Sequence, residues 1–145
     1  NEGDGTFLNV SKISGANDPR MGRGAGVLDI DDDGCLDLYI VNFAESAALL
    51  KNGCEYGNHW LKVILRGNES NRDGIGSLIT MSTDGKEQVR QLTAGMGFLG
   101  QSSTVVHFGM GRAVTVDKLS IRWPSGKLQE LLDIPSDQTI VVQEP

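Results

Sequence analysis

The stretch Asp29-Ile30-Asp31-Asp32-Asp33-Gly34-Cys35-Leu36-Asp37 contains five aspartates in nine residues. Carboxylates at this density repel one another unless a cation lies among them, so the stretch predicts a binding site for a hard divalent ion. Its spacing matches positions 1, 3, 5, 7 and 9 of a calcium loop of the EF-hand type, with glycine at position 6 to permit the sharp turn. The predicted calcium ligands are Asp29, Asp31, Asp33, the backbone carbonyl of Cys35, and Asp37.

The surroundings of this loop differ from those of an EF-hand. Position 12, where an EF-hand needs a bidentate glutamate, is Ile40. The flanking residues 25–30 and 38–43 are apolar and β-branched, which predicts strands rather than helices. Asp32 falls at an even position of the loop, so we expect its side chain to point to water. The alternative is a merely solvated acidic turn, but the ordered spacing between two apolar segments favours calcium.

Composition favours an all-β protein of one ordinary domain or two small ones. The chain has 145 residues, of which 19 are glycine, and no window shows a long helical periodicity. The net charge is −6, and the 13 basic residues are scattered, which argues against a nucleic-acid partner. No apolar run approaches the ~20 residues of a membrane span. Because the sequence begins at Asn1 without a methionine, we expect a fragment or a processed product.

Alternating apolar residues between turn signals predict short strands along the whole chain. In the first part the predicted strands cover residues 7–10, 25–30, 38–43 and 47–51, with the dipeptide Asp4-Gly5 forming a turn before the first. In the second part they cover residues 59–66, 77–83, 87–93, 105–108, 117–123, 127–132 and 139–143. Strands at this spacing indicate a β-sandwich or a small barrel.

The first part resembles a known repeat. The order N-x-G-D-G-T-F at residues 1–7, a glycine-rich loop, D-x-D-x-D-G-x-x-D-L from Asp29, and L-x-K-N-G ending at Gly53 is similar to one unit of the FG-GAP or VCBS-type repeat of integrin-like β-propellers. The resemblance implies that residues 1–57 form a single blade or a stub, and that the acidic loop joins two of its strands and holds calcium. A propeller needs about 4 to 8 such blades.

The second part, residues 58–145, resembles the ASPIC/UnbV domain. That domain follows FG-GAP-type repeats in secreted proteins of the cartilage acidic protein type and in exported bacterial proteins, and the resemblance implies no catalytic activity. The segments that carry it run in order through this half: Asn58-His59-Trp60-Leu61, residues 70–76, residues 94–99, His107-Phe108-Gly109-Met110-Gly111 and Arg122-Trp123-Pro124-Ser125-Gly126.

Two cysteines allow one disulfide, between Cys35 and Cys54, but spacing alone does not decide whether it forms. Neither cysteine has a histidine beside it in sequence, which argues against a catalytic thiol. The histidines, His59 and His107, lack the paired spacing of a zinc site, so we expect each to be a strand residue with a satisfied hydrogen bond.

Three further motifs have simpler structural explanations. Gly95 to Gly100 fits G-x-G-x-x-G, but strand-like residues follow it, so we expect a tight bend with Phe98 and Leu99 turned inward rather than a nucleotide site. Arg72-Asp73-Gly74 predicts a plain turn; the alternative is a polar ligand patch of Asn71, Arg72 and Asp73 with Arg66 and His107. Trp60 and Trp123 are expected in the core, although exposed indoles would instead offer a platform for a sugar.

These features predict a non-enzymatic, calcium-binding extracellular module for adhesion, recognition or assembly. No G-x-S-x-G elbow or comparable catalytic arrangement is present. Expected partners are a protein or glycan ligand at the cell surface, or further copies of the chain in an oligomer or filament, since unpaired sheet edges pair readily. The alternatives are a carbohydrate-binding module and an accessory domain of a larger exported enzyme.

Overall fold

The protein is all-β, as the composition predicts. The computed structural model describes residues 2, 4–54, 57–98 and 100–145, and these form strands, turns and loops without a helix. None of the described residues belongs to a helix that could cross a membrane. In chain order the strands are β1 (Gly22–Leu28), β2 (Asp37–Asn42), β3 (Ala48–Leu50), β4 (His59–Arg66), β5 (Leu78–Thr83), β6 (Lys86–Gln91), β7 (Val106–Gly111), β8 (Thr115–Arg122), β9 (Leu128–Pro135) and β10 (Gln138–Gln143).

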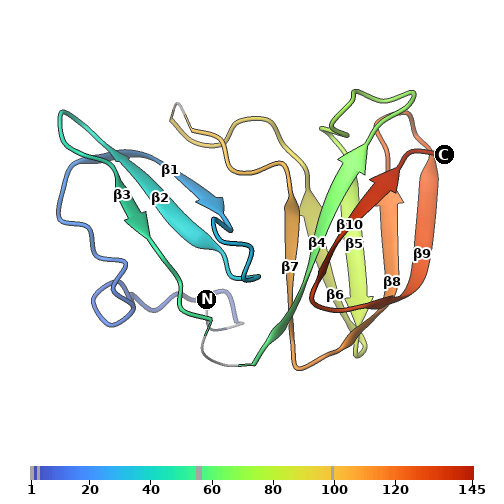
Figure 1. Ribbon diagram of the computed structural model, residues 1–145, viewed down its shortest axis with the longest axis horizontal. Helices are drawn as coiled ribbons and strands as arrows, with labels where there is room; N and C mark the ends of the chain where they lie inside the picture. Colours follow the sequence, from blue (N-terminus) through green and yellow to red (C-terminus); the bar gives the residue numbers. More distant parts are fainter. Residues whose placement is uncertain (1, 3, 55–56, 99) are drawn as a thin grey trace.

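The first three strands form an antiparallel sheet in the order β1-β2-β3 (Figure 1). The β1–β2 ladder runs in register from the pair Gly24↔Val41 to the pair Leu28↔Asp37. The acidic stretch of residues 29–37, called the aspartate loop below, therefore turns the chain at the end of this hairpin. Among the described residues before position 58, Ala48 is the one buried hydrophobic side chain. Apart from Ala48, the apolar side chains on both faces of this small sheet therefore remain at least partly exposed.

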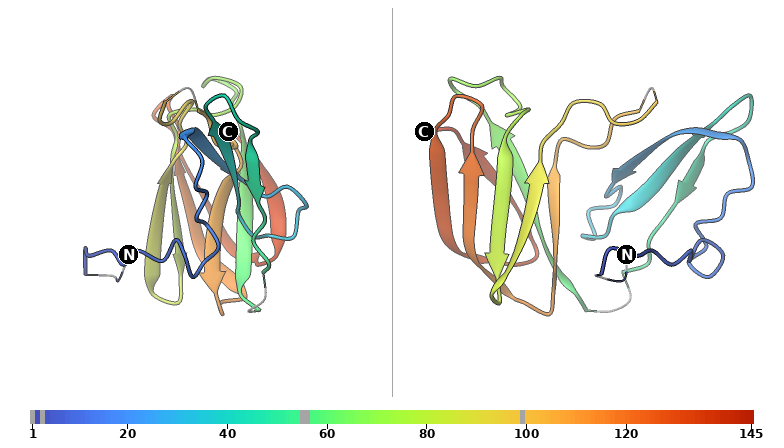
Figure 2. Two further views of the ribbon diagram at one scale, coloured as in Figure 1. Left: turned by 90° about the vertical axis from the view of Figure 1, so that its left-hand side faces the viewer. Right: turned by 180° about the vertical axis from the view of Figure 1, so that it is seen from behind.

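The remaining strands form a β-sandwich, as their spacing predicts. A three-stranded sheet in the order β10-β4-β7 packs against a four-stranded sheet in the order β6-β5-β8-β9 (Figures 1 and 2). The apolar side chains that face inward from both sheets make one continuous core. Its members are Leu61, Val63, Leu65, Ile79, Met81, Leu92, Val106, Phe108, Met110, Ala113, Val116, Leu119, Ile121, Trp123, Ile134 and Val142.

Strand β4 is the central strand of its sheet and has packed side chains on both faces. It pairs in parallel with β10 and antiparallel with β7, which fixes its orientation. Its odd-numbered residues from Leu61 to Leu65 enter the sandwich core, since successive side chains in a strand point to opposite faces. Its even-numbered residues therefore lie on the outer face, and Lys62 and Trp60 from that face meet the aspartate loop.

The predicted strand at residues 7–10 is wrong. Phe7 is 78% exposed, and residues 5–10 pair with no strand among the described residues. The turn before it does form, because Asp4 Oδ1 accepts hydrogen bonds from the backbone N–H of Thr6 at 2.9 Å and from its hydroxyl at 2.7 Å. Strand pairing needs a partner as well as a turn, and an apolar run by itself supplies none.

The glycine-rich segment after β6 extends away from the sandwich and over β1 (Figure 1). Its bend forms as expected, closed by a hydrogen bond from Met96 N to Gly100 O at 2.9 Å. The prediction that Phe98 turns inward is wrong because its side chain is exposed, and Leu99 lies outside the described residues. The backbone of this segment passes close to the backbone of β1. A Cβ on Gly26 would lie 3.1 Å from the carbonyl oxygen of Gln101, which explains why β1 has a glycine at this position.

Candidate metal centre

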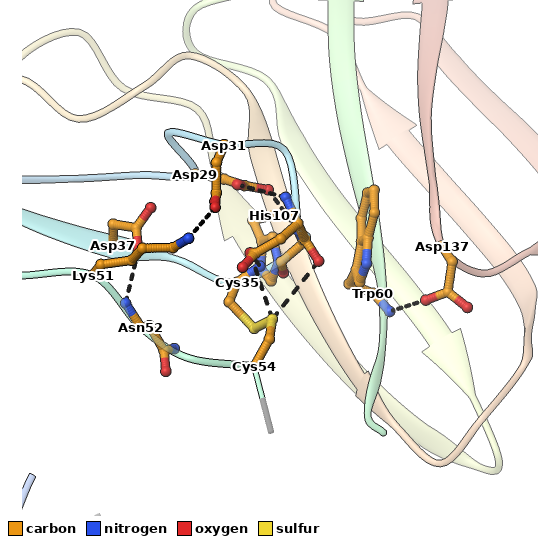
Figure 3. Close-up of a disulfide and its surroundings, with 12 residues drawn as sticks. Asp29, Asp31, Cys35, Asp37, Lys51, Asn52, Cys54, Trp60, His107 and Asp137 are labelled. Atoms are coloured by element: carbon orange, nitrogen blue, oxygen red, sulfur yellow. Dashed lines mark hydrogen bonds and ion pairs between the residues drawn. A yellow bond between two sulfur atoms is a disulfide. The ribbon is translucent and has the colours of Figure 1, made fainter. Parts of the chain in front are cut away.

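Asp37 fixes both ends of the aspartate loop. Its side chain is 1% exposed, at the first position of β2. One carboxylate oxygen accepts a hydrogen bond from Ile30 N at 3.0 Å, and the other accepts one from Asn52 N at 2.8 Å (Figure 3). A buried carboxylate held by backbone N–H groups is a fixed point, so it anchors the start of the loop and the segment after β3 at one place.

Asp29 organises the turn itself. Its Oδ1 accepts a hydrogen bond from Asp33 N at 3.2 Å, and its Oδ2 accepts one from Gly34 N at 2.9 Å. Burial raises the pKa of Asp29, but hydrogen bonds from the Lys62 ammonium and the Gly34 N–H outweigh that effect, and the net pKa is lowered. Asp29 is therefore held as a carboxylate.

The structure brings together three of the predicted metal ligands. Carboxylate oxygens of Asp29, Asp31 and Asp37 all lie within 4.8 Å of one another. Two oxygens on opposite sides of a calcium ion at 2.4 Å would be separated by about 4.8 Å, so the grouping fits one coordination sphere. The donors are all oxygen and all anionic, which is the donor set that calcium prefers.

Of the other two predicted ligands, Asp33 is grouped with the sulfur atoms of Cys35 and Cys54, whereas the ligand predicted from Cys35 is its backbone carbonyl oxygen. Asp33 Oδ1 accepts a hydrogen bond from Cys35 N at 2.9 Å. Cys35 and Cys54 form a disulfide with a Cα–Cα separation of 5.8 Å, which the sequence left undecided. Their sulfur atoms are thus not thiolate ligands, and the bridge ties the aspartate loop to the segment that leads into β4 (Figure 3).

Two lysines pair with the loop carboxylates. Lys51 forms an ion pair with Asp31, and Lys62 Nζ lies 2.9 Å from Asp29 Oδ2 and 2.7 Å from Asp32 Oδ1. The side chain of Asp32 is 88% exposed, in line with its predicted orientation, yet it has this partner that the sequence did not reveal. Five carboxylates against two ammonium groups leave a local charge of −3.

Gly34 is where the loop contacts the sandwich. The residue is buried with φ at +90°, and a Cβ there would lie 1.8 Å from Nε1 of Trp60. Its carbonyl oxygen accepts a hydrogen bond from His107 Nε2 at 2.7 Å (Figure 3). From the spacing of the loop, the sharp turn was the one reason we had for a glycine at this position. The contacts with Trp60 and His107 had no signal in the sequence, because they join residues far apart in the chain.

Other sequence candidates fall into structural roles. Trp123 is buried in the core and donates from Nε1 to Gln129 Oε1 at 3.0 Å, so its face is not available to a sugar. The prediction that Trp60 lies in the core is wrong, because its side chain is on the outer face of β4, partly buried against Gly34. His59 Nδ1 lies 2.5 Å from Asp137 Oδ2. Each histidine thus has a hydrogen bond, as we expected. The partner of His107 is in the aspartate loop, and that of His59 is in the turn between β9 and β10.

The alternative ligand patch around residues 71–73 assembles only in part. Arg72 pairs with Asp73 at 3.1 Å, and Arg66 Nη1 lies 3.6 Å from the same carboxylate. Asn71 instead closes its own turn with the backbone of Ile75. Including His107 in this patch is wrong, because its ring bonds to the aspartate loop.

A groove of about 840 Å³ lies beside the aspartate loop, between the small sheet and the sandwich. Its walls come from β1, β2 and the outer face of β4, and from the segment after β6. The side chains of Asp29, Lys62 and His107 line it together with apolar residues such as Val41 and Ile64. The candidate metal centre is thus at the junction of the two parts of the fold.

The fold and the site together define a class: an all-β chain in which a sandwich carries a small sheet with an aspartate loop. A sequence profile of the family described as "ASPIC and UnbV" matches residues 67–145, which is more than half of the chain. The chain belongs to the ASPIC and UnbV family.

Curated relatives of this chain include cartilage acidic protein 1 from three vertebrates. The protein of Mus musculus is 29% identical over 112 residues, that of Xenopus tropicalis 29% over 110, and that of Homo sapiens 28% over 112. Each match covers 74% of this chain but 17% of the relative. The chain therefore spans about a sixth of the length of these proteins.

Proposed function

We propose that this chain is a non-enzymatic calcium-binding module that acts outside the cell in adhesion, recognition or assembly. In this proposal residues 1–57 are an FG-GAP-type repeat and residues 58–145 are the ASPIC/UnbV domain that follows it. The observation that carries the proposal is the convergence of Asp29, Asp31 and Asp37 within 4.8 Å.

Calcium would act as a structural ion in the loop. It would offset the repulsion among carboxylates that otherwise opposes folding of the hairpin between β1 and β2. The loop has no bidentate glutamate, since position 12 is Ile40, and Lys51 and Lys62 already neutralise part of its charge. These features favour the modest affinity of extracellular modules, with a Kd of about 10⁻⁴ to 10⁻³ M.

Two observations support a location outside the cytoplasm. The disulfide between Cys35 and Cys54 is of a kind that persists in oxidising compartments. The curated relatives are named for cartilage, a tissue that is mostly extracellular material. A millimolar calcium site would also be filled only where calcium is abundant.

The small sheet offers a surface for a partner. Large apolar side chains on β1, β2 and β3 and just after β2 are exposed on the two faces of the sheet, and exposed apolar patches are a mark of interaction sites. They are Val27, Tyr39, Val41, Phe43 and Leu49. A protein ligand or a second copy of the chain could cover them, which supports the assembly part of the proposal.

Calorimetric calcium titration of the metal-stripped chain tests the proposed site. We expect one-site binding with a rise in Tm, and we expect Asp31→Asn to lose at least tenfold in affinity because it removes a charged ligand. Asp133→Asn is the matched control, since Asp133 lies in β9 at φ +52°, a conformation that asparagine also tolerates. Absence of both heat and stabilisation at millimolar calcium would refute the proposal.

A further inference from the structure

Lys62 stands out among the basic residues because it is buried. Its side chain is 6% exposed although it comes from the outer face of β4, in the sandwich rather than in the sheet that carries the aspartate loop. The ammonium lies between Asp29 and Asp32 and 4.8 Å from the centre of the Trp60 ring. A buried lysine with carboxylate and aromatic partners is held in a fixed position.

The hydrogen bonds of Asp29 show what this ammonium does to a predicted metal ligand. A carboxylate offers about four lone-pair sites, and three at Asp29 are occupied by Asp33 N, Gly34 N and Lys62 Nζ. One site remains, so a cation can bind Asp29 through a single lone pair while Lys62 stays in place. The positive charge 2.9 Å from this carboxylate also repels any incoming cation.

We propose that Lys62 sets the calcium affinity of the aspartate loop and thereby couples metal binding to the contact between the small sheet and the sandwich. This inference rests on the proposed calcium function. Lys62 is a positioning residue: it leaves the Asp29 carboxylate one free lone-pair site, and its positive charge reduces the net negative charge that attracts the ion. Because Lys62 belongs to β4, the affinity depends on the loop being docked against the sandwich.

The test is calcium titration of the full chain with Lys62→Met, which keeps an unbranched apolar stem against Trp60 and removes the charge. The affinity for calcium should rise about three- to tenfold at low salt, and less at high salt, because a screened unit charge near the ion is removed. Lys62→Arg, which keeps the charge, should bind calcium like the wild type. Lys118→Met is the matched control, since Lys118 pairs with Glu130 across β8 and β9, away from the loop.

A second measurement reports on the contact between the aspartate loop and the sandwich. Hydrogen exchange at the Gly34 amide, which Asp29 holds against the turn, should be faster in Lys62→Met than in the wild type without calcium. Calcium should slow that exchange in both proteins. Should Lys62→Met fail to fold, Lys62→Gln replaces it, since the amide can still donate to Asp29 without a charge.

The outcomes separate this inference from the function on which it rests. If the wild type binds calcium and folded Lys62→Met binds it equally or more weakly, the role of Lys62 is refuted and the calcium site stands. If neither protein binds at millimolar calcium, both are refuted. If Lys62→Met binds and the wild type does not, Lys62 replaces the metal in the native loop, which supports the inference and refutes the calcium function.

Discussion

Glu144 is the residue whose burial most needs explanation, because no cation lies beside it among the described ion pairs. It is buried near the C-terminus, where its carboxylate accepts four hydrogen bonds from neutral donors. They are Asn68 N at 2.6 Å, Ser70 N at 2.7 Å, Ser70 Oγ at 2.8 Å and Ser125 Oγ at 2.6 Å. Burial raises the pKa of Glu144, but these hydrogen bonds outweigh it and lower the pKa to about 2.

This carboxylate should make stability depend on pH in acid. The pKa of Glu144 is lower in the folded chain than its ordinary value of 4.5, so the stabilisation is complete above pH 4.5 and is lost as the pH falls toward 2. Glu144→Gln should lower Tm at pH 7 by about 10 °C and flatten the pH dependence in that window. Thermal melts from pH 7 to 2 measure both effects, and identical pH profiles of the two proteins would contradict this role. Glu130→Gln, at an exposed ion pair, is the control.

Single residues also show what sequence reasoning can reach. The spacing of the aspartates predicted the loop and the sharp turn at Gly34, since both are consequences of local geometry. The same reasoning missed Lys62 and His107, which meet the loop from strands far along the chain. It also predicted that Phe98 turns inward, which is wrong, because the sequence of a bend does not show which of its side chains face the protein and which face solvent.

At the scale of elements, the disulfide connects the aspartate loop to the end of the small sheet. It closes a segment with a sequence separation of 19 between Cys35 and Cys54, around β2 and β3. Constraining such a loop stabilises the folded state by about 3 kcal/mol in the chain-entropy account. The same bridge holds Lys51 and Asn52 near Asp31 and Asp37, so it also shapes the candidate metal site.

Removing the disulfide should therefore weaken both folding and metal binding. The double variant Cys35→Ala and Cys54→Ala should lower the unfolding free energy of the small sheet by about 2–4 kcal/mol and reduce calcium affinity severalfold. Denaturant unfolding and calcium titration, each with and without a reducing agent on the wild type, provide the measurements. Unchanged affinity in the double variant would show that the bridge does not shape the site.

Strand prediction succeeded where a strand had a partner with a matching apolar face. The predicted strands from β1 to β10 agree with the observed ones to within a few residues, and in the sandwich this follows because alternation reports the face that lines the core. The exception at residues 7–10 has apolar residues but no partner, so nothing stabilises the extended pairing. The order of strands in each sheet, including the parallel pairing of β10 with β4, depends on contacts between distant segments. Local sequence patterns could not predict it.

At the scale of the whole molecule, the two parts differ in how they are stabilised. Every member of the hydrophobic core belongs to the sandwich, between Leu61 and Val142, whereas the small sheet buries little beyond Ala48. Burial of apolar area is the main source of folding free energy, so the core of the sandwich can stabilise the sandwich by itself. The small sheet lacks such a core and depends on the disulfide and on the docked loop, and in our proposal on a bound cation.

The sandwich should therefore fold alone. A chain of residues 58–145 should melt cooperatively, whereas residues 1–57 alone should be unfolded without calcium, even though their two cysteines can pair. Circular dichroism and the dispersion of NMR amide signals measure this directly. A cooperative, well-dispersed fragment 1–57 would contradict the assignment of stability, and an unfolded fragment 58–145 would contradict the domain division.

The most direct test of the central claim, a cation held by the aspartate loop, is terbium luminescence excited through tryptophan. Terbium is a hard cation that replaces calcium at oxygen sites, and Trp60 lies against Gly34 of the loop, so a bound ion would receive energy from that indole. We predict emission that saturates, that calcium reverses, that needs at least tenfold more terbium in Asp31→Asn, and that Trp60→Phe abolishes. Absence of emission, or the same terbium titration curve in Asp31→Asn as in the wild type, would contradict the account.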